Sequence, residues 1–382
     1  MKMSNKRIVI LGGYGNTGSL IARYLLQEAN CELVLAGRNR SRAEQLAQAL
    51  NAQTQGRRVS GVFANAAEEE SLQRAFANAD LVIVASSTTQ FTRQIAAAAL
   101  ASRCDYFDIQ FSHAKIDYLK FIENDVRSAG LCFITDGGFH PGLPAVMIRH
   151  IAEKFDRLQI ARVGSVIKIN WRDLSLGDDT FAELIEFMND FSGAVFKKGK
   201  WQKVRGFGMF DTIWMDFGEP FGKNYCVPMP IEEITSLPAM YPGLQDTGFY
   251  VGGFNWFVDW LVFPFIWPLY KLLGKRSVKP LGKVLGWGLR NFSKPPFGTR
   301  LKVEASGMKN GRALSRNLIL SHADGYVFTA IPVVATLLQY LDGSGRKPGL
   351  WTQAHFCEPK RMLRDMQRMG IEMGESNSAE RA

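Results

Sequence analysis

The chain has 382 residues, of which 46% are hydrophobic and 21% are charged. This length exceeds what a single hydrophobic core usually supports, and it predicts two domains. The apolar content excludes a disordered or collagen-like chain. Lysines and arginines number 46 against 36 aspartates and glutamates, which gives a formal net charge of +10. What that charge means depends on where it lies.

The cysteines and the first residues of the chain bear on the compartment. The five cysteines are widely scattered and contain no CxxC pair: Cys31, Cys104, Cys132, Cys226 and Cys357. This pattern argues against a disulfide framework and against a zinc site, so we expect no metal. The apolar run at 8–11 is too short for the core of a signal peptide. We therefore expect a cytoplasmic protein.

A short apolar run followed by glycines comes first along the chain. Arg7-Ile-Val-Ile-Leu11 is typical of a buried strand, and apolar residues at helical spacing follow the glycines. Glycines in the pattern G-x-G-x-x-G permit a tight turn, close approach of a pyrophosphate and close packing of helix on strand. A loop that merely connects two elements is the alternative reading. The position between strand and helix favours a dinucleotide site formed by Gly13, Tyr14, Gly15, Asn16, Thr17 and Gly18.

Strands and helices alternate through the first third of the chain. Further strands are predicted at 33–36, 59–63, 81–85, 106–109 and 131–135, and helices between them at 42–50, 69–78, 91–101 and 115–129. Strands that alternate with helices pair in parallel through crossover connections. The predicted fold is therefore α/β, with an N-terminal Rossmann domain built on a doubly wound parallel sheet.

The end of the second predicted strand indicates which dinucleotide is bound. NAD enzymes usually carry an acidic residue there to hold the ribose 2′-hydroxyl. The segment Ala36–Arg42 has no acid and three arginines. A guanidinium can pair with a 2′-phosphate, so Arg38, Asn39 and Arg42 are predicted to bind NADP(H). A solvated first turn of the next helix is the alternative for these arginines, and it suits Arg40.

Polar residues also follow the later predicted strands, where ligands of open α/β sheets bind. Ser86 and Ser87 follow the fourth strand and are predicted to line the dinucleotide. His140 lies in the loop 136–142, which is rich in glycine and proline. A lone loop histidine is more often a solvated or capping group than a proton donor. The candidates for the catalytic proton donor are His140, Asp108, Tyr326 and Thr329.

The order of several motifs resembles that of the saccharopine dehydrogenase family, in its NADP-dependent saccharopine reductase-like branch. They are VILGGYGNTG, LAGRNRSRAEQLA, VIVASSTTQFTRQIAAAAL, YFDIQ and GGFHPGLP, followed by KKGKWQKVRG and VFTAIPVVATLLQYLDGSGRKPGLW. The resemblance implies reduction of a C=N bond or another unsaturated group. It also implies a second α/β (α+β) domain that binds substrate and mediates homodimerisation.

The predicted organisation follows from these motifs. Residues 1–137 are expected to form the NADP-binding domain and residues 138–345 the substrate and dimerisation domain. Residues 346–382 are expected to pack back on the first domain and to end in a disordered tail at 373–382. Residues 254–303 have no counterpart in the family members that metabolise amino acids, and they are predicted to be an insert.

This insert holds most of the excess positive charge. Residues 260–303 contain nine lysines and arginines and no acid, which leaves +1 for the rest of the chain. The aromatic run 260–270 is too short to span a bilayer as a helix and contains two prolines. Aromatic residues followed by lysines suit peripheral contact with the cytoplasmic face of a membrane. A subunit interface and a lid over an apolar substrate pocket are the alternatives.

Two functions are consistent with these features. The first is an NADPH-dependent oxidoreductase that transfers a hydride to a C=N or an activated C=C or C=O group of a small molecule. An amino-dicarboxylic substrate would need several cations, and only scattered ones such as Arg172 and Arg205 are found. A lipid-like substrate agrees better with the insert. The second function is a membrane-associated NADPH-binding adaptor without catalysis. Nucleic acid is not expected, because no recognition motif is present.

Overall fold

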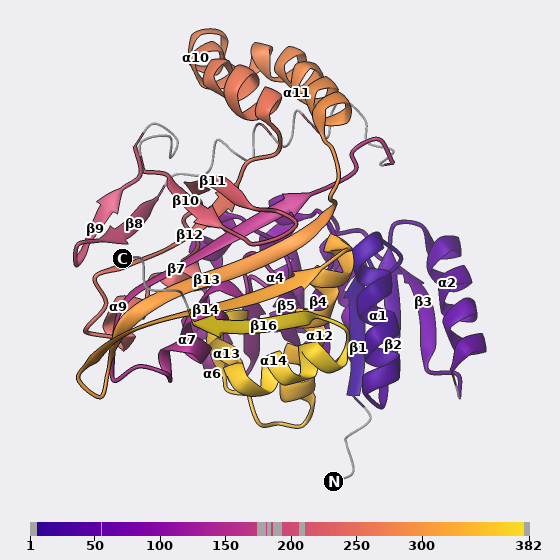
Figure 1. Cartoon of the computed structure of the whole chain (residues 1–382). Helices are drawn as coiled ribbons and strands as arrows, with labels where there is room; N and C mark the ends of the chain where they lie inside the picture. Colours follow the sequence, from indigo (N-terminus) through magenta and orange to yellow (C-terminus); the bar gives the residue numbers. More distant parts are fainter. Residues whose placement is uncertain are drawn as a thin grey trace. The chain divides into compact units, whose positions relative to one another are not determined.

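The chain forms two compact units (Figure 1). A computed structural model describes residues 6–54, 56–173, 181, 185, 193–205 and 211–377. Unit 1 comprises Met1–Val146 and Tyr326–Ile371, and unit 2 comprises Met147–Gly325 and Glu372–Ala382. The units therefore divide at 146 and 325, where the sequence placed boundaries at 137 and 345.

Unit 1 is built on a parallel sheet of seven strands with the order β15-β6-β5-β4-β1-β2-β3. The strands are β1 (Lys6–Leu11), β2 (Cys31–Gly37), β3 (Val59–Phe63), β4 (Leu81–Val84), β5 (Asp105–Asp108), β6 (Cys132–Thr135) and β15 (Gly349–Thr352). This arrangement confirms the predicted doubly wound sheet. The order reverses between β1 and β4, which is where such sheets bind ligands. The seventh strand, β15, was not predicted.

The helices of unit 1 follow the predicted alternation with one difference. They are α1 (Asn16–Glu28), α2 (Arg40–Gln53), α3 (Glu69–Phe76), α4 (Thr92–Ala101), α5 (His113–Phe121), α6 (Glu123–Ser128), α12 (Gly325–Leu341), α13 (Gln353–Phe356) and α14 (Pro359–Arg368). The prediction of one helix at 115–129 is wrong. The backbone leaves the helical conformation at Ile122, and two helices result.

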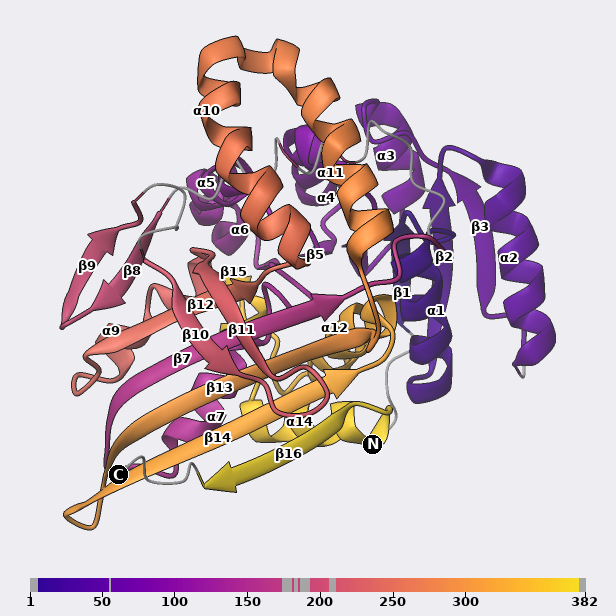
Figure 2. The same ribbon diagram turned by 45° about the horizontal axis from the view of Figure 1, so that its top comes forward.

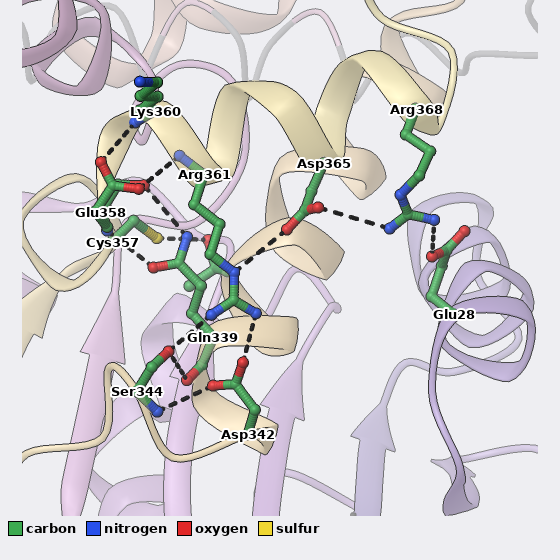
Figure 3. A network of polar contacts seen from close by, with 11 residues as sticks. Glu28, Gln339, Asp342, Ser344, Cys357, Glu358, Lys360, Arg361, Asp365 and Arg368 are labelled. Atoms are coloured by element: carbon green, nitrogen blue, oxygen red, sulfur yellow. Dashed lines mark hydrogen bonds and ion pairs between the residues drawn. The ribbon is translucent and has the colours of Figure 1, made fainter. Parts of the chain in front are cut away.

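The C-terminal helix α14 is tied to the rest of unit 1 by buried methionines and by a polar network. Met362 and Met366 are fully buried. Figure 3 shows Arg361 reaching Asp342 and Ser344, at 2.5 and 2.9 Å. Farther along, Arg368 pairs with Glu28 of α1. These contacts hold the C-terminal segment against the N-terminal elements within the unit.

Unit 2 is built on a mixed sheet with the order β10-β11-β12-β7-β13-β14-β16. In addition, β8 pairs with both β12 and β9. The strands are β7 (Arg157–Lys168), β8 (Ala194–Lys197), β9 (Lys200–Lys203), β10 (Ile213–Asp216), β11 (Lys223–Pro228), β12 (Asp246–Gly252), β13 (Gly298–Lys309), β14 (Arg312–His322) and β16 (Glu372–Asn377). Because β16 pairs with β14, residues 373–377 form a strand where the sequence predicted a disordered tail. The end of that tail, 378–382, lies outside the described residues.

A helical hairpin connects β12 to β13, and Figure 2 shows its two arms side by side. It comprises a π-helical turn (Val258–Val262), α10 (Phe263–Leu273), a short 3₁₀ turn (Gly274–Ser277) and α11 (Val278–Phe292). Val262 and Ile266 of the first arm share an apolar core with Leu285 and Leu289 of the second. This core makes the hairpin a packed element of unit 2.

The predicted bounds of the insert extend too far. Residues 298–303 belong to β13, whose Leu301 and Val303 are fully buried. Two of the nine cations, Arg300 and Lys302, therefore belong to the sheet and not to the hairpin. Arg300 donates to the backbone oxygen of Phe217 at 2.9 Å, and Lys302 lies 2.7 Å from the carboxylate of Glu304. The remaining seven are those of the hairpin and its flanks.

Candidate functional site

The loop after β1 turns at a glycine that the sequence pattern did not assign to the turn. Gly12 has a φ of +86°, and its amide donates to the carbonyl of Ala36 at 2.8 Å. A Cβ at Gly12 would lie 2.8 Å from that of Ser86, so the loop runs directly beside the end of β4. The sequence analysis assigned the tight turn to the glycine pattern that begins at Gly13, but the residue with the positive φ is Gly12. A glycine is needed at position 13 for a different reason: a Cβ there would lie 2.9 Å from the carbonyl oxygen of Ile10 and 2.9 Å from the side chain of Leu35.

The same loop leaves the first turn of α1 open to a ligand. Gly15 is the N-cap and supplies no side-chain cap, so the first amides of the helix, those of Asn16, Thr17 and Gly18, are not capped by it. A Cβ on Gly18 would collide with the carbonyl of Gly12. Helix and loop backbone thus approach as closely as glycine allows. Uncapped amides at a helix N-terminus fit a pyrophosphate.

Tyr14 organises the residues at the end of β2. Its hydroxyl accepts a hydrogen bond from the amide of Asn39 at 2.9 Å. A Cβ on Gly37 would lie 2.6 Å from the tyrosine ring, so a glycine is required there. The guanidinium of Arg42 lies 5.2 Å from the ring centroid. Asn39 also caps α2 by accepting from the amide of Arg42 at 3.0 Å.

The arginines beside Tyr14 differ in their surroundings. Arg40 pairs with Glu44 one helical turn later at 2.7 Å, which matches the reading of a solvated helix turn. Arg38 is exposed at the point where β2 ends. Arg38 and Arg42 therefore remain the predicted ligands of a 2′-phosphate. A cation at this strand end suits NADP(H) better than NAD.

Gln110 joins the ends of β4 and β5. Its side-chain amide donates to the carbonyl of Ser86 at 2.5 Å and to the hydroxyl of Thr88 at 3.1 Å. The hydroxyls of Ser86 and Thr88 lie 3.1 Å apart, and Ser87 is exposed. The sequence analysis missed Gln110. The sequence feature that could have indicated Gln110 is a polar side chain two residues past a buried strand, at the edge of the sheet where ligands bind.

A fully buried lysine binds two aspartates below this edge. The Nζ of Lys115 lies 2.6 Å from Asp108 and 2.8 Å from Asp136, and none of the three is more than 2% exposed. Thr135 donates to the second oxygen of Asp108 at 2.7 Å. Burial lowers the pKa of Lys115, but the two carboxylates outweigh burial and the net shift is upward. The lysine is therefore charged at neutral pH.

This network bears on Asp108 as a candidate proton donor. Both of its carboxylate oxygens accept hydrogen bonds from buried groups. The amide of Gln110 donates to it as well, at 3.1 Å. A carboxylate that is closed from solvent and paired with a lysine suits a positioning role better than proton transfer. Asp108 thus fixes the strand ends that carry Gln110 and Asp136.

The loop after β6 is held by a residue from the C-terminal part of unit 1. Gln353, which is fully buried, accepts from the amide of Gly138 at 3.1 Å and donates to its carbonyl at 2.8 Å. His140 follows in this loop and contacts the ring of Phe139, with the centroids 4.1 Å apart. Burial lowers the pKa of His140 to about 4. The imidazole is therefore neutral at pH 7. It lacks the additional proton that an imidazolium could donate.

Tyr326 and Thr329 lie three residues apart in the first turns of α12, so they share one face of the helix. The methyl group of Thr329 would lie 3.2 Å from a Cβ on Gly138, which places this face beside the loop of His140. Tyr326 is 40% exposed. Of the four predicted proton donors, Thr329 thus lies beside Gly138 in the loop that carries His140. Tyr326 lies one turn away on α12, and Asp108 lies in the buried network.

Other kinds of site find little support in the described part of the chain. No group of three histidines, cysteines or acids there is placed to hold a metal ion. The five cysteines are buried thiols. Among the described residues, no helix has the length and apolar character needed to cross a bilayer.

Comparison with known families decides the nature of the N-terminal unit. Residues 8–129, from β1 to the end of α6, match the saccharopine dehydrogenase NADP-binding domain. This match confirms the predicted family resemblance, the predicted cofactor NADP(H) and the predicted class, an NAD(P)-dependent oxidoreductase. No curated protein matches the chain.

One solved structure extends the similarity in fold beyond this NADP-binding domain. Saccharopine dehydrogenase (L-Glu forming) from Saccharomyces cerevisiae is similar over 98% of this chain and 100% of its own, with a TM-score of 0.70 and 15% identity. A meso-dapdh variant from Clostridium tetani E88 is similar over 93% of this chain and 95% of its own, with a TM-score of 0.47 and 12% identity. The similarity to the yeast protein confirms the predicted α/β fold with a second α/β (α+β) domain, whose sheet is mixed in this chain.

Proposed function

We propose that the chain is an NADPH-dependent reductase of a C=N or an activated C=C or C=O group in a lipid-like small molecule. The observation that carries the proposal is the loop Gly12–Gly18, which follows the carboxyl end of β1 and leads into helix amides without a side-chain cap. When bound, NADPH supplies the hydride for such a reduction. The protein supplies orientation and a proton.

In this proposal, different residues bind different parts of the cofactor. The amides of Asn16, Thr17 and Gly18 hold the pyrophosphate. Arg38 holds the 2′-phosphate, and Tyr14 orients the strand end through Asn39 and Arg42. On the nicotinamide side the turn Ser86–Thr89 lines the site, and Gln110 fixes its conformation. Ser87 is exposed in the same turn.

Replacing Arg38 with alanine is expected to weaken NADPH binding while leaving NADH binding unchanged. A charge-assisted hydrogen bond to a phosphate contributes about 1.5–3 kcal/mol, so the Kd for NADPH should rise about 10–100-fold. Calorimetric titration of both nucleotides measures the effect. The matched control is R40A, because Arg40 already pairs with Glu44. Equal losses for NADPH and NADH in R38A would contradict the assignment.

Tyr326 is the residue we propose as proton donor, with Thr329 beside it on α12. Its partial exposure leaves the phenol accessible to a substrate. His140 is neutral at pH 7, and Asp108 is buried against Lys115. Both observations favour the tyrosine over the other two candidates. A phenol can give its proton at neutral pH without first being charged.

The hairpin of unit 2 supports a lipid-like substrate and contact with a membrane surface. Several apolar side chains of the hairpin are each more than half exposed, among them Trp260, Phe265 and Leu272. Trp256, just before the hairpin, is more than half exposed as well. Cations accompany them, and residues 260–303 contain no acid. Exposed aromatic residues with lysines suit the headgroup region of an anionic membrane. We place the protein at the cytoplasmic face of a membrane, as a homodimer through unit 2.

The proposal is tested by NADPH oxidation with two substrate panels. One panel holds hydrophobic enoyl and carbonyl compounds, and the other holds amino-dicarboxylic adducts. We expect turnover of the hydrophobic panel. Turnover of the amino-dicarboxylic panel alone would refute a lipid-like substrate. NADPH binding by thermal shift without turnover of any compound would favour the second function, an NADPH-binding adaptor at a membrane.

A further inference from the structure

A pocket lies at the bend of the hairpin, where α10 ends and α11 begins. Its volume is about 330 Å³, which is at the lower end of the range for small-molecule sites. The lining comes from both arms and from the turn between them, and it includes Leu269, Leu272, Leu273, Arg276, Pro280 and Leu281. Gly274, with a φ of +60°, permits the sharp turn that brings the two arms together. The pocket is therefore a product of the hairpin fold itself.

The leucines of this pocket are unusually exposed for their size. Leu272 is 79% exposed, and Leu273 and Leu269 are 53% and 36% exposed. Below them the hairpin already has a core, which Leu281 joins. The exposed leucines are thus not needed to close that core. Contiguous exposed apolar side chains of this kind mark a binding surface.

Charge identifies the ligand that would cover these leucines. Among the described residues that line the pocket, Arg276 carries the charge, and its side chain is exposed. No aspartate or glutamate occurs between residues 260 and 303, so nothing nearby in sequence offsets it. A guanidinium can pair with a phosphate through two parallel hydrogen bonds. A ligand with an anionic phosphate joined to an apolar chain complements both parts of the lining.

We propose that this pocket captures one anionic glycerophospholipid from a bilayer, with its acyl chain on Leu269, Leu272 and Leu273 and its phosphate at Arg276. This proposal rests on the membrane contact in the proposed function, and it assigns that contact to one lipid-binding pocket. Surface contact alone requires only many cations near a charged membrane. Capture of one lipid requires these particular residues. The pocket would thereby anchor the hairpin at a defined depth.

Two probes separate capture from general adsorption. The first is dihexanoyl-phosphatidylglycerol below its critical micelle concentration, titrated calorimetrically into the full-length protein. The second is sedimentation with phosphatidylcholine vesicles, with and without phosphatidylglycerol. We expect saturable binding of one soluble lipid per chain. L272Q should weaken it about tenfold and R276Q about fivefold.

Matched controls lie on the same hairpin outside the pocket. V284Q and K283Q change an exposed apolar residue and an exposed cation of α11. We expect both to bind the soluble lipid like the wild type. Vesicle binding without binding of the soluble lipid would overturn the pocket and leave the membrane contact standing. Equal losses of lipid affinity in the pocket variants and the control variants would overturn the pocket too. A change in the oligomeric state of L272Q would also overturn it, because the leucines would then belong to a subunit interface.

Discussion

Replacing Lys115 with methionine is expected to lower the free energy of unfolding by about 3–5 kcal/mol. The substitution leaves Asp108 and Asp136 buried without their shared cation. Methionine fills a similar volume, so the loss reports the missing charge rather than a cavity. The pKa of Lys115 is raised in the folded protein, and its contribution is therefore fully present below its ordinary value of 10.5. Denaturant unfolding at pH 7 measures the whole effect.

Two further variants control this experiment. K120M changes an exposed lysine on the same helix, α5, and should alter stability by less than about 0.5 kcal/mol. T135V removes the hydroxyl that donates to Asp108 and should cost about 1–2 kcal/mol. Wild-type stability in K115M would contradict a stabilising role for the ion pairs of Lys115.

Much of unit 1 could be predicted because local patterns and the fold agree there. Each predicted strand of the first six overlaps an observed strand, since short β-branched runs between helices leave few alternatives. The glycine pattern also located the ligand loop. It did not locate the turn, because Gly12 precedes the motif, and its positive φ depends on the contact with β4.

The parts that were not predicted depend on residues distant in sequence. β15 has four residues, and it becomes a strand because β6 offers a free parallel edge. Lys115 faces inward because carboxylates 7 and 21 residues away meet it. Helix periodicity places a lysine on the solvent side by default. Gln353 reaches Gly138 across 215 residues, which no local pattern indicates.

The position of the positive charges in the basic insert also depends on residues distant in sequence. Counting residues placed Arg300 and Lys302 with the hairpin, although both belong to β13 and contact backbone oxygens or a carboxylate there. Strand pairing with β7 and β14 decides this, and it is a tertiary property. Among the described side chains of the hairpin, Arg276, Lys279 and Lys283 are exposed cations. These are the cations to which we assign the proposed membrane contact.

Replacing Tyr326 with phenylalanine is expected to lower kcat about 10²–10⁴-fold, the usual contribution of a positioned proton donor. NADPH affinity should not change, because Tyr326 lies on α12 and the predicted cofactor ligands lie after β1, β2 and β4. The KM should change little as well, since the ring remains. Stopped-flow measurement of NADPH oxidation in a single turnover isolates the chemical step from product release.

Three other variants decide whether the phenol itself is responsible. Y118F removes a hydroxyl from α5 in the same unit and should leave kcat unchanged. T329V tests the neighbour on the same face of α12, and a smaller loss there is consistent with a supporting contact. H140N should retain most activity, because burial keeps His140 neutral above pH 5 in any case. A wild-type kcat in Y326F together with a large loss in H140N would move the proton donor to the loop after β6. The low pKa of His140 would then have to rise when substrate binds.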